Sequence, residues 1–138
     1  MMQAKESDVF FARVWSAIEK GGKDLLWMSE SDKPLEAIKI GKVDFMYEKA
    51  TGAKWIKDKD PQVRLTTLKH SMPGKRWAKG WERLMYLFVG HKDVSIYKVP
   101  VQTEMEEDLG QPATEFRLYV LRDMGFYKVG FFTTLIET

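Results

Sequence analysis

The chain of 138 residues contains no cysteine and only two histidines, His70 and His91. Without thiols it has no disulfide scaffold, no cysteine nucleophile and no thiolate metal site. The two histidines are 21 positions apart, whereas histidines that share a zinc ion on one helix are separated by about three to five residues. We therefore expect neither a disulfide-stabilised domain nor a histidine-built zinc site.

Long hydrophobic runs are missing as well. The longest apolar run, at residues 84–89, is far shorter than the ~20 residues that cross a bilayer. Residues 1–6 include Lys5 and Glu6 and lack the uncharged apolar stretch of a secretory signal. These absences predict a cytoplasmic protein without membrane association.

Motifs of common enzyme classes are also absent. The sequence holds no glycine-rich loop at phosphate-binding spacing and no Gly-x-Ser-x-Gly elbow. His70 precedes Ser71, but adjacency in sequence does not make a nucleophile–base pair in space. The consecutive acids at 106–108 point in different directions. We predict that the protein is not an enzyme and has no cofactor of its own.

Charge, by contrast, is plentiful and unevenly distributed. With 44% hydrophobic and 30% charged residues, residues 1–138 are expected to form one globular domain. Residues 1–38 hold five basic and seven acidic side chains, residues 39–98 hold 14 and six, and residues 99–138 hold three and seven. Two acidic ends thus flank a basic middle. This asymmetry indicates charged partners, although an unevenly charged solvated surface explains the same counts.

The first third of the chain predicts a helix followed by a strand. Ser7 and Asp8 are expected to cap the helix, and Gly21 to end it. Its apolar face is expected to consist of Phe11, Val14, Trp15 and Ile18, with Trp15 in the core. Residues 38–47 alternate between apolar and polar and predict a strand, in which a bulge at Gly41 would explain a shift in phase.

The middle third predicts one clear helix. Residues 48–62 are rich in lysine and turn formers and predict a loop, while residues 63–71 show no clear pattern. A helix is expected after Gly74, ending near Gly90. Its apolar face consists of Trp77, Trp81, Leu84 and Phe88, for which core packing is the expected role.

The last third predicts antiparallel strands. Residues 94–99 form a strand signal closed by Pro100. Residues 115–122 and 127–136 alternate, and a short turn joins them as a β-hairpin. Helices followed by antiparallel strands predict an α+β fold, with helices packed on a mixed or antiparallel sheet.

Basic residues surround the tryptophans of the middle segment. Those nearest in sequence are Lys54, Lys57, Lys59, Lys75, Arg76, Lys79 and Arg83. Interleaved basic and aromatic side chains can bind nucleic acid through phosphate contacts and base stacking. An amphipathic helix with a charged outer face explains the same pattern.

An acidic segment lies between the first helix and the first strand. In it, Glu30 and Asp32 alternate with serines just before Pro34. Such a loop can present carboxylates to a basic partner. A turn whose side chains bond to its own backbone explains the same residues.

Two stretches carry a family resemblance. Residues 25–32 read Leu-Leu-Trp-Met-Ser-Glu-Ser-Asp, with Pro34 and Glu36 following, and resemble the signature of the nuclease A inhibitor family. The ending, Val129–Thr138, resembles the end of those inhibitors. The resemblance implies an α/β/α sandwich with a C-terminal hairpin. It also implies a cytoplasmic inhibitor of a metal-dependent, sugar-nonspecific nuclease.

The resemblance also implies roles for individual residues. Glu30 would engage arginines in the nuclease active site, and the terminal carboxylate of Thr138 would bind the partner's catalytic metal. The partner's Mg²⁺ would then bridge the complex. Asp32 and Glu137 would add negative potential, and Trp77 would be the counterpart of an interface tryptophan. A carboxylate suits both tasks, as a hard oxygen ligand and as a partner for an arginine fork.

The sequence also departs from the family. Lys33 and Leu35 stand where the inhibitors usually have aromatic residues, and residues 39–98 are basic where family members are acidic overall. Two alternatives follow. One is a nucleic-acid-binding or regulatory module that uses residues 39–98. The other is an immunity-like protein against a different toxin nuclease, with Lys33 as the first clue.

Overall fold

The computed structural model of the chain describes residues 2–21, 34–50, 55–71, 75–101, 108–110 and 115–136. Its elements are α1 (Met2–Gly21), β1 (Glu36–Gly41), α2 (Lys42–Ala50), β2 (Ile56–Lys57), α3 (Pro61–Ser71), α4 (Lys75–Tyr86), β3 (Val94–Val101), β4 (Glu115–Asp123) and β5 (Tyr127–Ile136). The strands form one antiparallel sheet in the order β1-β5-β4-β3-β2. The predicted α+β fold is confirmed, and the sheet is antiparallel rather than mixed.

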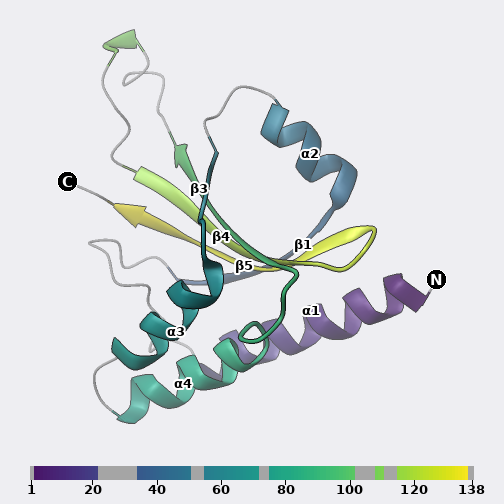
Figure 1. Cartoon of the computed structure of the whole chain (residues 1–138), viewed down its shortest axis with the longest axis vertical. Helices are drawn as coiled ribbons and strands as arrows, with labels where there is room; N and C mark the ends of the chain where they lie inside the picture. Colours follow the sequence, from purple (N-terminus) through teal and green to yellow (C-terminus); the bar gives the residue numbers. More distant parts are fainter. Residues whose placement is uncertain are drawn as a thin grey trace.

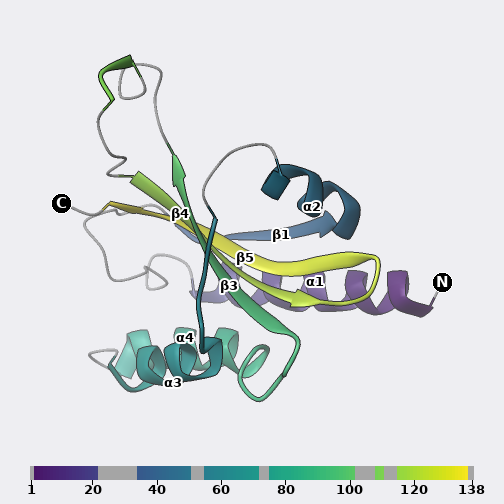
Figure 2. The same ribbon diagram turned by 45° about the horizontal axis from the view of Figure 1, so that its top comes forward.

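Helices cover both faces of the sheet (Figures 1 and 2). On one face lie α1, α3 and α4, and the main core between them and the sheet includes Val14, Trp81, Leu84, Phe88, Val120, Val129 and Phe131. On the other face lies α2, over a smaller core of Phe45, Tyr97, Val99, Tyr119 and Leu121. The result is a three-layer α/β/α arrangement. Trp81 is 1% exposed, as its predicted core role requires.

The predicted C-terminal hairpin is confirmed. Residues 115–123 of β4 pair with residues 128–136 of β5, and residues 124–126 connect the two strands. Gly125 adopts a φ of 84°, which only glycine adopts without strain. Its N–H donates to Asp123 Oδ1 at 3.1 Å, and the Met124 N–H donates to the Tyr127 carbonyl at 2.9 Å.

Helix α1 differs from the prediction in its start and in its buried face. It begins at Met2, so that Ser7 lies inside the helix and is fully buried instead of capping it. The buried stripe runs through Ser7, Phe10, Val14, Ala17 and Gly21. Small residues on this stripe let the helix lie close to its neighbours, and the bulky Trp15 faces outward with 51% exposure. The predicted core position of Trp15 is therefore wrong.

The strand predicted across residues 38–47 ends at Gly41, and α2 follows directly. Phe45 is buried, whereas Val43 is 79% exposed. The apparent alternation at 43, 45 and 47 thus came from a helix in which Phe45 is buried and Val43 is exposed. The Lys42 N–H donates to the Phe126 carbonyl at 2.8 Å. This hydrogen bond follows the last β1–β5 pair, between Gly41 and Tyr127, at the point where β1 ends.

Helix α3 occupies the segment without a clear pattern, and β2 lies within the predicted loop. A local signal for the helix was present, because Asp60 caps it through the Val63 N–H at 3.2 Å and Pro61 occupies its first position. The α3 side chain of Gln62 also holds the turn after α4. It donates to the carbonyls of Phe88 and His91 at 3.3 and 2.9 Å, and accepts the Gly90 N–H at 2.8 Å.

Candidate functional site

Four of the predicted contact residues, Glu30, Asp32, Glu137 and Thr138, lie outside the described residues. The departure at Lys33 also lies outside them. Trp77 belongs to α4, but its side chain is not among those described.

The pairing of β1 with β5 places the start of β1 and the end of β5 at one end of the sheet. Glu36 at the start of β1 pairs with Phe132, and β5 continues from there to Ile136. Because the strands are antiparallel, Glu36 and Ile136 lie toward the same end of the sheet, on neighbouring strands. Ile136 in turn pairs with Glu115 at the start of β4, which adds a described carboxylate there.

A groove of about 470 Å³, here called the β1 groove, lies at this end of the sheet. Its lining comes from α1, the start of β1 and β5: Trp15, Ile18, Glu19, Pro34, Leu35, Glu36, Ala37 and Phe132. Leu35 is buried, and Trp15 presents half of its surface. Glu19 and Glu36 are exposed on the rim. An exposed tryptophan beside an apolar slot with an acidic rim suits docking of a basic protein partner.

The chain matches no protein-family model and no curated protein sequence. The function of the β1 groove must therefore be argued from its chemistry. Within the described ranges, no helix is long and apolar enough to cross a membrane. The same ranges contain no group of three or more His, Asp or Glu side chains placed to hold a metal ion.

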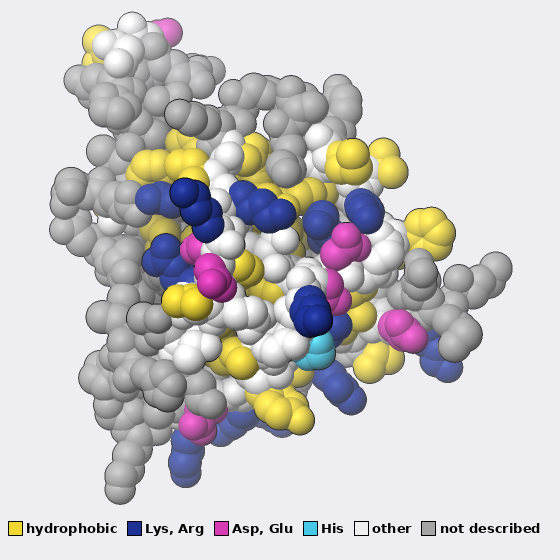
Figure 3. Space-filling view, viewed as in Figure 1, with side chains coloured by type: hydrophobic (Ala, Val, Ile, Leu, Met, Phe, Trp, Pro, Cys, Tyr) yellow, Lys and Arg dark blue, Asp and Glu magenta, His cyan; other side chains and the backbone are white. Residues whose placement is uncertain are grey.

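Ion pairs between segments reduce the charge asymmetry seen in the sequence. The acidic ends reach into the basic middle, where Asp8 pairs with Lys39 and Asp123 pairs with Lys42 at 3.1 Å. Within the middle segment, Asp58 binds Arg64 at 3.0 Å. Other basic side chains stay exposed, and Figure 3 shows Lys and Arg side chains in a row across the molecule. Lys57 and Lys59 lie at the β2 edge, and Lys79 lies on α4.

The surroundings of Asp123 lower the pKa of its carboxyl group. Partial burial acts to raise the pKa of this carboxyl, but the hydrogen bond from Lys42, the Gly125 N–H and the charge of Lys128 outweigh it and lower the pKa below 3.8. The ionised carboxylate therefore fastens the hairpin tip to the start of α2.

Replacing Asp123 with asparagine should reduce the dependence of stability on pH. A carboxyl whose pKa is lower in the folded state than in the unfolded state stabilises the fold at pH values above the unfolded-state pKa. This contribution is lost as the pH falls through the folded-state pKa. The group is partly exposed, so we expect a contribution of about 1 kcal/mol or less. Urea unfolding at pH 7 and pH 3 measures it, with Asp44→Asn as the control. If the free energy of unfolding changed equally between pH 7 and pH 3 in the wild type and in Asp123→Asn, the lowered pKa of Asp123 would be contradicted.

Proposed function

We propose that the protein is a non-enzymatic inhibitor of a metal-dependent, sugar-nonspecific nuclease and acts in the cytoplasm. The observation that supports the proposal is the β1–β5 register, in which the start of β1 and the end of β5 lie at the same end of the sheet. Four positions separate Pro34 from Glu30, and two separate Ile136 from Thr138. Because β1 begins at Glu36, six positions after Glu30, an extended chain reaches at most about 22 Å from the start of β1 to Glu30 and about 7 Å from the end of β5 to Thr138. These lengths allow both carboxylates to enter one active site.

The chemistry of the target supports this pairing of carboxylates. A nonspecific nuclease binds phosphodiesters through basic side chains and a divalent cation, so its active site is strongly positive. In our proposal Glu30 binds the arginines and the terminal carboxylate of Thr138 binds the metal, Mg²⁺. Asp32 and Glu137 strengthen the negative potential. The inhibitor thereby occupies positions that substrate phosphates would take.

The β1 groove supplies the apolar part of the proposed interface. Carboxylates alone give a salt-sensitive contact, whereas stable protein complexes are anchored by a few buried aromatic or arginine side chains. Trp15, Leu35 and Phe132 all line the groove, and Leu35 immediately precedes β1 in the chain. Trp77 of α4 remains a second proposed contact on the strength of the resemblance.

The function is tested by titrating the protein against a Mg²⁺-dependent nonspecific nuclease while plasmid digestion is followed. We expect digestion to stop near equimolar inhibitor, with a complex that survives size-exclusion chromatography. Trp15→Ala should weaken inhibition by about 2 kcal/mol, or roughly 30-fold, because it removes the apolar anchor.

The matched control is Phe126→Ala, at an exposed aromatic residue of the hairpin tip, where 68% of the side chain is accessible. This tip lies at the other end of β5 from the β1 groove, so inhibition should be unchanged. Full nuclease activity at a tenfold excess of the wild-type protein would refute the proposed function. An equal loss for both variants would remove the groove from the interface.

The exposed lysines of the middle segment support a second candidate, a nucleic-acid-binding module. It rests on Lys57, Lys59 and Lys79 in the described structure, and on Lys54, Lys75 and Arg76 from the sequence. A gel-shift series without nuclease separates the two candidates, because phosphate contacts weaken steeply as salt rises. Protection of plasmid only where the protein itself shifts the DNA would favour the module. Protection without a shift would favour an inhibitor, including an immunity-like one against a different nuclease.

A further inference from the structure

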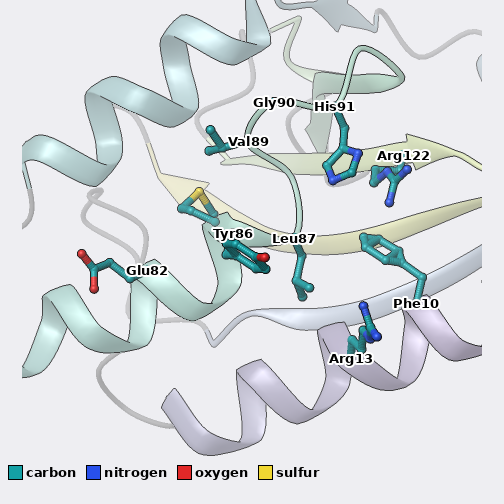
Figure 4. A pocket seen from close by; sticks show the side chains of 10 residues that line it. Phe10, Arg13, Glu82, Tyr86, Leu87, Val89, Gly90, His91 and Arg122 are labelled. Carbon is teal, nitrogen blue, oxygen red and sulfur yellow. The ribbon is translucent and has the colours of Figure 1, made fainter.

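A second cavity, of about 700 Å³, lies between α1, α4 and the end of β4, away from the β1 groove. We call it the α1–α4 pocket (Figure 4). Its principal lining residues are Phe10, Arg13, Glu82, Tyr86, His91 and Arg122. The volume lies within the range of about 300–1,000 Å³ that is usual for small-molecule sites.

The basic side of this pocket is held in place before any ligand arrives. Arg122 donates to both carboxylate oxygens of Asp93, at 3.0 and 3.1 Å, and its guanidinium lies 4.8 Å from the centre of the Phe10 ring. These bonds use two of the five guanidinium N–H groups, which leaves three for other acceptors. Gln62 fixes the turn that carries His91. A preorganised site loses less entropy on binding than a mobile one.

The positive groups gather at one end of the pocket. In Figure 4, Arg13, His91 and Arg122 surround Phe10, while Glu82 lies at the opposite end on α4. Among the described residues Arg13 has no ion-pair partner, and its side chain is exposed. The pocket thus has two guanidinium groups, and only that of Arg122 is paired. A phosphate monoester, with a charge of about −1.5 to −2, suits two such groups better than a ligand with a single carboxylate does.

The rest of the lining is apolar and aromatic. Met85, Leu87 and Val89 contribute aliphatic surface, and the Tyr86 side chain is 81% exposed between the basic end and Glu82. An exposed aromatic ring at a pocket wall offers a stacking surface for a planar ring. The pocket therefore combines an oxyanion site with a stacking surface.

We infer that the α1–α4 pocket binds a phosphate monoester that carries a planar aromatic ring and has the size of a nucleoside monophosphate. The phosphate accepts hydrogen bonds from Arg13 and Arg122, and the planar base lies against Tyr86. This inference is independent of the nuclease-inhibitor proposal, because it concerns different residues and a small molecule.

The test is isothermal titration calorimetry of the full chain with adenosine 5′-monophosphate. We expect saturable binding at one site, with at least tenfold weaker binding of adenosine and of inorganic phosphate, each of which lacks half of the interaction. Arg13→Gln should weaken binding of the nucleotide about tenfold or more. Tyr86→Ala should weaken it about fivefold or more. Both side chains are exposed, so neither change should alter the unfolding midpoint.

Lys20→Gln is the matched control, since it removes one positive charge from an exposed position of the same helix outside the pocket. The affinity of Lys20→Gln for adenosine 5′-monophosphate should equal that of the wild type. Absence of saturable binding by the wild-type protein would overturn the inference. Equal weakening by Arg13→Gln and Lys20→Gln would do the same, because it would show attraction by net charge without a site.

Discussion

Replacing Gly130 with alanine should destabilise the protein by about 3 kcal/mol or more, the largest loss of stability that we expect from adding one methyl group. Gly130 is buried in β5, between Leu121 of β4 and Ile38 of β1. A Cβ atom there would lie 1.8 Å from the Val120 carbonyl oxygen and 3.0 Å from the Leu121 Cα. These neighbours belong to the backbone of a paired strand, so relief requires the sheet itself to move. Domains of this kind are stable by only about 5–15 kcal/mol.

Urea unfolding measures this loss, and Gly41→Ala provides the control. A Cβ atom at Gly41 would meet Asp44 Oδ2 at 3.1 Å, the end of an exposed side chain that can rotate away. We expect Gly41→Ala to change stability by less than about 1 kcal/mol. Equal unfolding midpoints for the two variants would show that β4 and β5 are not as close at Gly130 as the structure places them.

Truncating the acidic contacts should have the largest effect on function. In the proposed complex, Glu30→Ala leaves a buried cationic group of the nuclease without its partner. Removal of Thr138 draws the terminal carboxylate back by one residue, about 3.5 Å along the chain, and so leaves the metal without it. Losses of this type amount to about 2–5 kcal/mol, or roughly 30-fold to several thousand-fold in the inhibition constant. Neither residue belongs to a described helix or strand, so the unfolding midpoint should stay unchanged.

Asp44→Ala is the charge-matched control, because Asp44 is exposed on α2, beyond the other end of β1. Combining Glu30→Ala with removal of Thr138 adds a further test. If the two carboxylates bind separate groups, their losses should add within about 0.5 kcal/mol. Full inhibition by both single variants would exclude the proposed mechanism, even if the chain still bound the nuclease elsewhere.

The sequence predicted the elements whose side-chain period is unambiguous. Strands β3, β4 and β5 and helix α4 each show a clear period, and all four are present. Helix α2 was missed because apolar residues at 43, 45 and 47 imitate a strand, although Phe45 is buried and Val43 is exposed. Helix α3 was missed because its apolar residues do not gather on one face, and the cap at Asp60 carried the signal instead.

The candidate site was harder to predict than the fold. The β1 groove depends on Trp15 facing outward, whereas hydrophobicity alone placed Trp15 in the core. Which face of α1 is buried was decided by size, because Ser7, Ala17 and Gly21 permit close packing. The neighbouring positions of the start of β1 and the end of β5 depend on the pairing of these two strands, and no local pattern specifies a partner so distant in the chain. The α1–α4 pocket likewise combines three elements that the sequence separates.

That distant pairing has a consequence for how the chain acquires its shape. Gly41 pairs with Tyr127 and Glu36 pairs with Phe132, so the partners are separated by 86 to 96 positions. Contacts of such long range slow folding, since loop closure precedes the stabilisation that they bring. During synthesis β1 must wait for β5 with its edge uncovered, and uncovered strand edges invite pairing with other chains. We expect β1 to be the last strand to join the sheet, and nascent chains that stop before β5 to be prone to aggregation.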